Sequence, residues 1–276
     1  MTGMQRRRSG FQATFSVGGL MLGALAALAA LFIRAWPTAA QQRDAPRVAE
    51  PSTLQIARNL YDSPKIPAFL GEPLVDDPKS LKRLEPNSPA WIDRQHKQVV
   101  LLGSVCQANY PLEFFATYPD RGYESVVVVY TRPSVIHAAL LALGAQPGTP
   151  VRYQPQFALP TGTQIEIAVA WKGPDGKPQK ARAQEWIRDI KTKKPLDVNW
   201  VFAGSMFWED KRTGEKSYLA DRGDFITVLN LPTALLDVPI QSASALESRR
   251  FEGAVDKLPA AGTPVTLILK PKLPSL

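Results

Sequence analysis

Two residues near the middle of the chain, Glu124 and His137, are the side chains best suited to acid–base chemistry. A carboxylate within hydrogen-bond reach of an imidazole can act as a general acid and base, because histidine titrates near neutral pH. Such a pair would support a hydrolase or a metal-dependent protein. The structural interpretation is that His137 is a neutral imidazole with one buried hydrogen-bond partner, while Glu124 pairs with Arg121 or Arg132.

The other side chains that could act in catalysis lack a catalytic pattern. Glu113 stands between two apolar residues, so in a strand it is expected to face water. Ser205 is not followed by the glycine that completes a nucleophile elbow. Cys106 is the only cysteine, and we expect it to pack as a small hydrophobic side chain. One cysteine and two histidines leave little material for a zinc or iron–sulfur site, so no metal and no cofactor are expected.

Four of the six tryptophans fall within 38 residues: Trp171, Trp186, Trp200 and Trp208. Aromatic faces bind sugar rings and cations, and Arg182 lies nearby to supply a polar contact. The candidate ligand-binding residues are therefore Trp171, Trp186, Trp208 and Arg182. The alternative is that several of these rings fill the core. A mixture is also consistent with the pattern, with Trp171 pointing inward and Trp208 near an exposed turn.

The N-terminus has the pattern of an export signal. Arg6, Arg7 and Arg8 precede residues 17–33, which contain no charge, and small residues follow up to Ala40. This apolar run would form about 25 Å of helix, slightly less than the ~30 Å bilayer core. A signal peptide cleaved after Ala40 and a retained anchor over residues 11–33 both remain open. In either case we expect the rest of the chain outside the cytoplasm: periplasmic, secreted or anchored to the membrane.

The charge of the chain does not favour nucleic-acid binding. The formal net charge is +8, but residues 1–40 hold four of the 33 basic residues and no acid. The remainder therefore has 29 basic and 25 acidic residues, without a stripe of alternating basic and aromatic side chains. We expect the partner to be a polymer or protein of the cell envelope, and the membrane itself if the N-terminal segment stays uncleaved.

Composition divides the chain into three parts. Residues 1–40 are the signal peptide or anchor. Residues 41–89 are expected to form a disordered or extended tether, since six prolines fall between Pro64 and Pro89. Residues 90–276 have the length and apolar content of a single globular domain.

Most periodic patterns within this domain are those of strands. The clearest helix covers residues 134–143, after Pro133 and before Gly144, and its apolar residues lie nearly all round, so we expect it to be buried. The fold predicted is α+β and β-rich, a mixed sheet with this one central buried helix. The expected strands are residues 91–93, 99–106, 112–116, 126–130, 164–171, 198–202, 217–220, 225–229 and 265–269.

Several short segments occur in an order that resembles the YdjY-domain family, exported proteins abundant in planctomycete bacteria. The resemblance covers residues 90–271 and implies export, but no activity, because the family is largely uncharacterised. The segments that carry it include Gly103-Ser104-Val105, Pro111-Leu112-Glu113-Phe114, Glu124-Ser125-Val126, Trp200-Val201-Phe202-Ala203-Gly204-Ser205 and Asp237-Val238-Pro239-Ile240.

The departures from the family pattern bear on metal and redox chemistry. Many relatives carry a cysteine where this chain has Thr117 and a histidine where it has Tyr123, while Glu124 and His137 remain. A Cys/His/Glu/His cluster would thus lack two of its ligands here. The interpretation we favour is an exported, non-enzymatic binding or structural module of the cell envelope. The alternative is a hydrolase or metal-dependent protein that uses Glu124 and His137.

Overall fold

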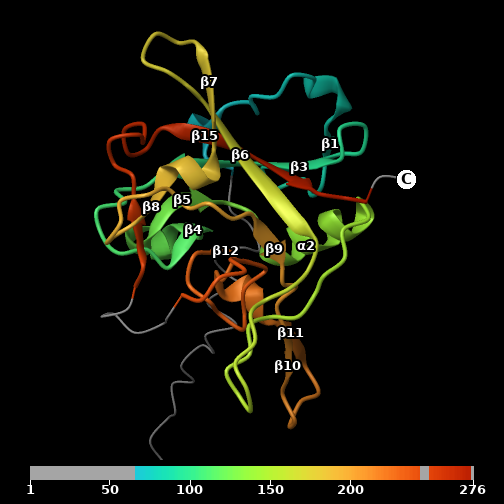
Figure 1. Ribbon diagram of the computed structural model, residues 1–276. Coiled ribbons are helices and arrows are strands. Elements are labelled where there is room, and N and C mark those ends of the chain that lie inside the picture. Colours follow the sequence, from blue (N-terminus) through green and yellow to red (C-terminus); the bar gives the residue numbers. More distant parts are fainter. Residues whose placement is uncertain (1–65, 243–248, 275–276) are drawn as a thin grey trace, which may run out of the picture. The chain divides into compact units, whose positions relative to one another are not determined.

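Strands make up most of the regular structure in residues 66–242 and 249–274, which a computed structural model describes (Figure 1). The predicted signal or anchor, and the tether as far as residue 65, lie outside these described residues. Within the described ranges, no helix is long and apolar enough to cross a membrane.

Eight strands close into a mixed barrel because β5 pairs with β3 at the end of the strand order. The pairs β4–β5 and β12–β13 are parallel, and the other neighbours around the ring are antiparallel. Closure gives every strand of this ring two neighbours within it, and the parts of β3 and β6 that these neighbours do not cover pair with additional strands. In order around the ring the strands are β3 (Gln98–Val105), β15 (Pro264–Pro271), β6 (Gln164–Lys172), β9 (Trp200–Phe202), β13 (Leu236–Asp237), β12 (Ile226–Thr227), β4 (Phe114–Thr117) and β5 (Ser125–Val129).

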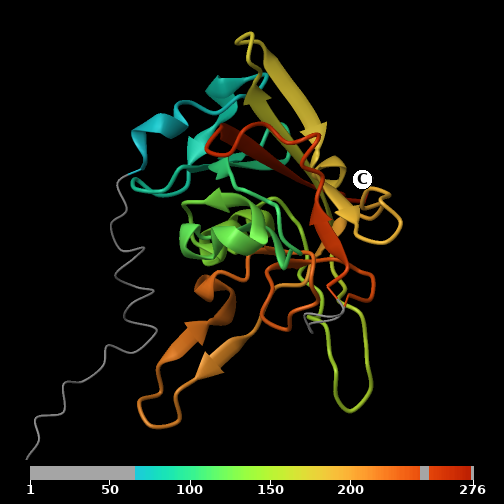
Figure 2. The same cartoon turned by 90° about the vertical axis from the view of Figure 1, so that its left-hand side faces the viewer.

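Shorter elements extend the ring. β2 (Ala90–Asp93) pairs with β3 and β1 (Lys82–Arg83) pairs with β2, while β7 (Pro178–Arg182) pairs with β6. Figure 2 shows the hairpin of β10 (Phe207–Glu209) and β11 (Lys216–Tyr218), in orange, projecting from the end of the domain opposite β7. A further pair is β8 (Ile187–Asp189) with β14 (Phe251–Gly253). The 3₁₀ turns are Ala68–Leu70, Pro78–Ser80, Pro119–Glu124, Ala183–Trp186 and Leu219–Arg222.

The alternation of apolar and polar residues positions β6 in the barrel wall. Ile165, Ile167 and Val169 are buried in the core, and Glu166 between them is exposed on the outer face. The uninterrupted apolar run of β5 is buried throughout, as its sequence predicts. These patterns confirm a β-rich domain with a mixed sheet.

The predicted helix is α2 (Pro133–Ala142), and it is only half buried. Ile136, Ala139 and Leu140 face the core, whereas Leu141 is 45 % exposed. The prediction of a central, buried helix is therefore corrected: α2 covers the barrel core with one face and presents the other to solvent. Ala138 and Ala142 explain the difference, because alanine counts as apolar in a pattern but is tolerated in water.

The proline-rich segment from residue 66 onward packs against the domain. Leu70 is buried with Trp91, Val100 and Leu102 in a small second apolar cluster. The backbone N–H of Leu74 donates to Thr266 Oγ1 on β15 at 2.9 Å. This segment therefore crosses the outer face of the sheet, and it forms one side of the groove described next.

Candidate functional site

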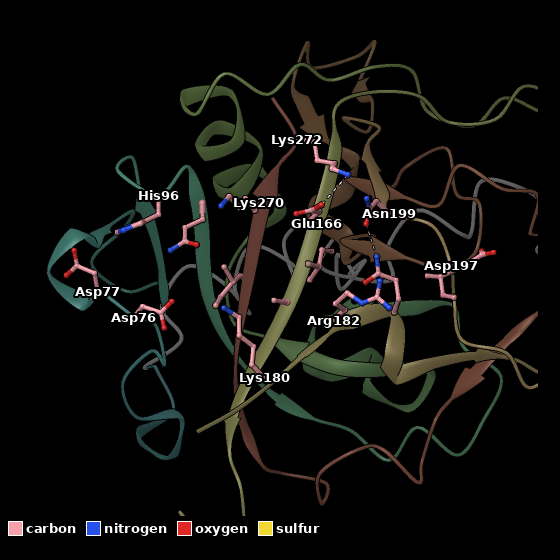
Figure 3. Close-up of a pocket in the computed structure, with 16 residues that line it drawn as sticks. Asp76, Asp77, His96, Glu166, Lys180, Arg182, Asp197, Asn199, Lys270 and Lys272 are labelled. Atoms are coloured by element: carbon pink, nitrogen blue, oxygen red, sulfur yellow. Dashed lines mark hydrogen bonds and ion pairs between the residues drawn. The ribbon is translucent and has the colours of Figure 1, made fainter. Parts of the chain in front are cut away.

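A groove with a volume of about 630 Å³ crosses the outer face of the sheet where β3, β15 and β6 lie side by side (Figure 3). Figure 3 shows Asp76, Asp77 and His96 on one side of it and Arg182, Asn199 and Asp197 on the other. Lys180 and Lys270 lie between the two sides. Polar and charged side chains thus surround the groove.

Strand register explains how the floor and one wall are built. Ile268 on β15 is opposite Ala168 on β6, which is in turn opposite Arg182 on β7. Two residues further along β6, Ala170 is opposite Lys180 on β7. Directly opposed residues of paired strands share a face, with neighbouring strands about 4.8 Å apart. Ala168 and Ile268 therefore form the floor, and two long cationic side chains stand beside it on β7.

Several charges in the groove are not used in ion pairs within the described residues. Lys272 pairs with Glu166 at 3.2 Å, and Arg182 Nε pairs with Glu185 at 3.2 Å. Lys180 and Lys270 have no ion pair or side-chain hydrogen bond in residues 66–242 and 249–274. The groove therefore keeps cationic groups that remain available to a ligand.

Gln184 adds a buried polar atom to the same groove. Its side-chain Nε2 donates to Val198 O at 3.2 Å and to Asn199 Oδ1 at 2.9 Å, and the residue is only 5 % exposed. Its Oε1 is buried and accepts no hydrogen bond from any described residue. A buried acceptor without a donor costs about 1–3 kcal/mol, so this oxygen favours any ligand or water that brings a donor.

His96 is the imidazole of the groove. It follows β2, and its Nδ1 lies 2.7 Å from Oδ2 of the fully buried Asp93, whose Oδ1 also accepts the backbone N–H of His96. Burial opposes ionisation of Asp93, but hydrogen bonds from His96, Ser80 and Gln98 outweigh it and lower the pKa of this carboxyl. The buried carboxylate thus holds the imidazole in one orientation.

The tryptophans do not gather at the groove. Trp186 and Trp200 are buried in the core, and Trp200 Nε1 donates to Thr227 O at 2.7 Å. Trp171 packs against Trp186 with ring centroids 5.1 Å apart, and it belongs to the core-facing row of β6. Trp208 is 46 % exposed on the β10–β11 hairpin, at the other end of the domain. Of the sequence-predicted binding residues, only Arg182 lines the groove.

Glu124 belongs to an ion-pair cluster rather than to a pair with histidine. Arg121 Nη2 lies 3.2 Å from Glu124 Oε1 and 3.3 Å from Glu113 Oε2, and its Nη1 lies 2.8 Å from Asp224 Oδ1. Arg249 reaches both Glu113 and Glu124 from the other side. Burial opposes the charge of Arg121, but Asp224 and Glu124 outweigh it and raise the pKa of the guanidinium. The expectation that Glu113 faces water is corrected, because two arginines draw its carboxylate inward.

His137 has a different partner, Tyr218. Its Nδ1 lies 2.7 Å from the Tyr218 hydroxyl, which donates to the Gly204 carbonyl at 3.0 Å. The hydroxyl has one proton, so His137 Nδ1–H is the donor to Tyr218. Burial lowers the pKa of His137, which favours the neutral imidazole. In the part of the chain that the structure describes, no hydrogen bond or ion pair joins His137 to Glu124.

The described residues offer little for metal or thiol chemistry. They contain no group of three or more His, Cys, Asp or Glu side chains arranged to hold a metal ion. Burial raises the pKa of the Cys106 thiol to about 11, so this cysteine is protonated at neutral pH. The groove, by contrast, is suited to holding a polar ligand on the outer face of the sheet.

Sequence reasoning did not find the groove residues Lys180, Lys270 and Gln184. The alternation along β6 does place Glu166 and Ala168 on the outer face. The residues that join them there depend on the register with β15 and β7, which no local pattern specifies.

Comparisons with known proteins place the domain in a family. A search of curated proteins and a search of solved structures each found no match. The model of the YdjY domain matches residues 90–270. This match spans most of the chain and nearly all of the closed sheet, together with the floor and the cationic wall of the groove. On that match, the chain belongs to the YdjY domain family.

Proposed function

We propose that this protein is a non-enzymatic binding module of the cell envelope, and that its domain holds an extended polar ligand in the outer-face groove. The observation that carries the proposal is the set of unused polar groups that line a groove floored by Ala168 and Ile268: Lys180, Lys270 and the buried Gln184 Oε1. A site with several polar groups converging on one hollow is the ordinary form of a ligand-binding site.

The proposal includes export. Arg6, Arg7 and Arg8 and the apolar residues 17–33 support a signal peptide or a retained anchor. The proline-rich chain up to residue 89 would then connect this segment with the barrel. Residues 66–89 already lie against the domain.

The contacts of Glu124 and His137 favour binding over the hydrolase alternative. Both side chains already have partners that occupy them: two arginines for Glu124 and Tyr218 for His137. A general base must reach the proton that it removes, and these two groups do not meet through any recorded contact of the described residues.

His96 supports a second candidate function, acid–base catalysis in the groove. A buried carboxylate that fixes one ring nitrogen of a histidine is also found in hydrolase triads. Such a triad needs a nucleophile beside the other ring nitrogen. Among the described residues, no serine, threonine or cysteine side chain is hydrogen-bonded to His96 Nε2, so we favour binding.

Co-sedimentation of the full chain with purified cell-wall sacculi tests the proposal. The groove variant is Lys180→Glu with Lys270→Glu, and the charge-matched control is Lys211→Glu with Lys257→Glu, two exposed lysines outside the groove. We expect the groove variant to lose at least tenfold in bound protein, while the control binds like the wild type. Equal binding by all three proteins, or no binding by the wild type, would contradict the groove as an envelope-polymer site.

A further inference from the structure

The chemistry of the groove indicates which class of ligand it binds. This inference rests on the proposed function. We propose that the groove binds an extended peptide with an amino or basic group near one end and a carboxylate near the other. Lys180 and Arg182 hold the carboxylate, Gln184 accepts a main-chain N–H, and Asp76 and Asp77 hold the cationic end.

The carboxylate subsite follows from the geometry of β7. Lys180 and Arg182 are two residues apart on this strand, so both side chains stand on one face with their Cα atoms about 7 Å apart. Lys180 has no ion-pair partner within the described residues. Arg182 uses Nε for Glu185, which leaves Nη1 and Nη2 without a recorded partner there. A guanidinium edge and an ammonium group bind a carboxylate through charge-assisted hydrogen bonds.

The balance of charges argues against a polyanion. The groove is lined by four basic residues, Lys180, Arg182, Lys270 and Lys272, and by four acids, Asp76, Asp77, Glu166 and Asp197. A nucleic acid or polyphosphate would meet these carboxylates at close range and be repelled. A ligand that carries charges of both signs matches the groove.

The acidic side of the groove is opposite Arg182, with Lys180 and Lys270 between them. Figure 3 shows Asp76 and Asp77 beside His96, across the floor from Arg182. Asp77 Oδ1 accepts the backbone N–H of Lys79, while its Oδ2 has no recorded partner within the described residues. Asp76 likewise has no recorded side-chain contact there. These two carboxylates are therefore available to an ammonium or guanidinium group of the ligand.

The floor and the buried amide favour a peptide over a sugar chain. Ala168 on the floor is small, so a main chain can approach the sheet closely at that point between the two charged sides. Gln184 Oε1 needs a donor such as a peptide N–H. Sugar rings usually stack on aromatic faces, and no tryptophan, tyrosine or phenylalanine among the described residues lines the groove.

The test uses the immobilised full chain and four defined probes. Three are peptide mixtures, Lys-X-X-Glu, Lys-X-X-Gln and Ala-X-X-Glu, with amidated C-termini, acetylated N-termini and X any residue except cysteine. The fourth is a set of chitin oligosaccharides. Mass spectrometry of the retained material measures binding. We expect at least tenfold more retention of Lys-X-X-Glu than of the Gln mixture, and a clear preference over the Ala mixture.

Protein variants locate the site. Lys180→Gln with Arg182→Gln should abolish the preference for Glu over Gln, and Gln184→Leu should weaken retention of every peptide mixture. Lys211→Gln with Lys257→Gln should bind like the wild type. Because the probe change from Glu to Gln leaves the protein intact, the comparison does not depend on a variant that might misfold.

The outcomes separate this inference from the proposed function. Equal retention of the Glu and Gln mixtures overturns the inference. Retention of chitin oligosaccharides without any peptide also overturns it. If no peptide is retained but the groove variant loses sedimentation with sacculi, the inference fails and the groove remains a binding site. If sedimentation also fails, both the inference and the proposed function are refuted.

Discussion

Replacement of Arg121 by methionine tests whether the cluster around Glu124 is a buried structural device. Arg121 contacts three carboxylates, those of Glu113, Glu124 and Asp224, at 2.8–3.3 Å. Methionine keeps much of the length and apolar surface of the side chain, but it lacks the guanidinium, whose Cζ lies 4.2 Å from the centroid of the Phe114 ring. The substitution therefore removes the charge, its hydrogen bonds and its cation–π contact with Phe114.

The expected loss follows from the burial of these groups. Removing one partner of a fully buried ion pair costs about 3–5 kcal/mol, and of an exposed pair about 0–1 kcal/mol. The Glu124 side chain is 7 % exposed and that of Arg121 is 28 % exposed, so the cluster lies between these limits. Arg249 remains beside Glu113 and Glu124. We therefore expect Arg121→Met to lower the free energy of unfolding by about 2–3 kcal/mol.

Urea unfolding of the full chain, followed by tryptophan fluorescence, measures this loss, because Trp186 and Trp200 report on the core. Arg182→Met is the control. It breaks an ion pair whose arginine is 73 % exposed, and it should cost at most about 0.5 kcal/mol. A loss below about 1 kcal/mol for Arg121→Met, or an equal loss for Arg182→Met, would refute the reasoning.

Three further predictions concern stability and location. Burial raises the pKa of Asp237 to about 7, despite hydrogen bonds from Thr227, Val238 and Asn230. The folded state therefore binds this proton more tightly than the unfolded chain, and stability should fall by up to about 4 kcal/mol as pH rises from about 4 to 7. Urea unfolding across this range should show a shallower decline in the free energy of unfolding for Asp237→Asn than for the wild type. Parallel curves for the two proteins would contradict a raised pKa of Asp237. Trp200→Phe leaves a cavity and an unpaired Thr227 carbonyl, so thermal and urea unfolding should show a loss of about 2–4 kcal/mol. Trp208→Phe, on the exposed hairpin, should cost under about 0.5 kcal/mol, and similar losses for both would count against this account. Cell fractionation should find the protein outside the cytoplasm, and the mass of the mature chain will show whether residues 1–40 are removed; a cytoplasmic protein would rule out export.

Much of the barrel could be predicted from local patterns. The apolar alternation in β6 and the continuous apolar run in β5 identified two of its strands, because each pattern reflects which faces of a strand are buried. The expected strands 91–93 and 99–106 correspond to β2 and β3, which pair with each other. Pro133 and Gly144 marked the limits of α2 closely.

Other elements could not be predicted because their stability is not local. β7 has the sequence Pro-Gln-Lys-Ala-Arg, with no apolar alternation, and it is a strand only because β6 offers an edge to pair with. Glu113 looked like a solvent-facing residue, yet its carboxylate pairs with Arg249, which is 136 residues away in the sequence. A pattern within ten residues carries no information on such a contact.

By itself, the sequence determined which strand faces are buried, where the chain turns, the pattern of an export signal and the resemblance to the YdjY domain family. Only the tertiary structure decided that β3 and β5 close the sheet, that Glu124 and His137 have separate partners, and that Lys180, Arg182 and Lys270 surround one groove. The physical reason is that burial follows from side chains within one element. The neighbours of a charged residue depend instead on the register between elements far apart in the chain.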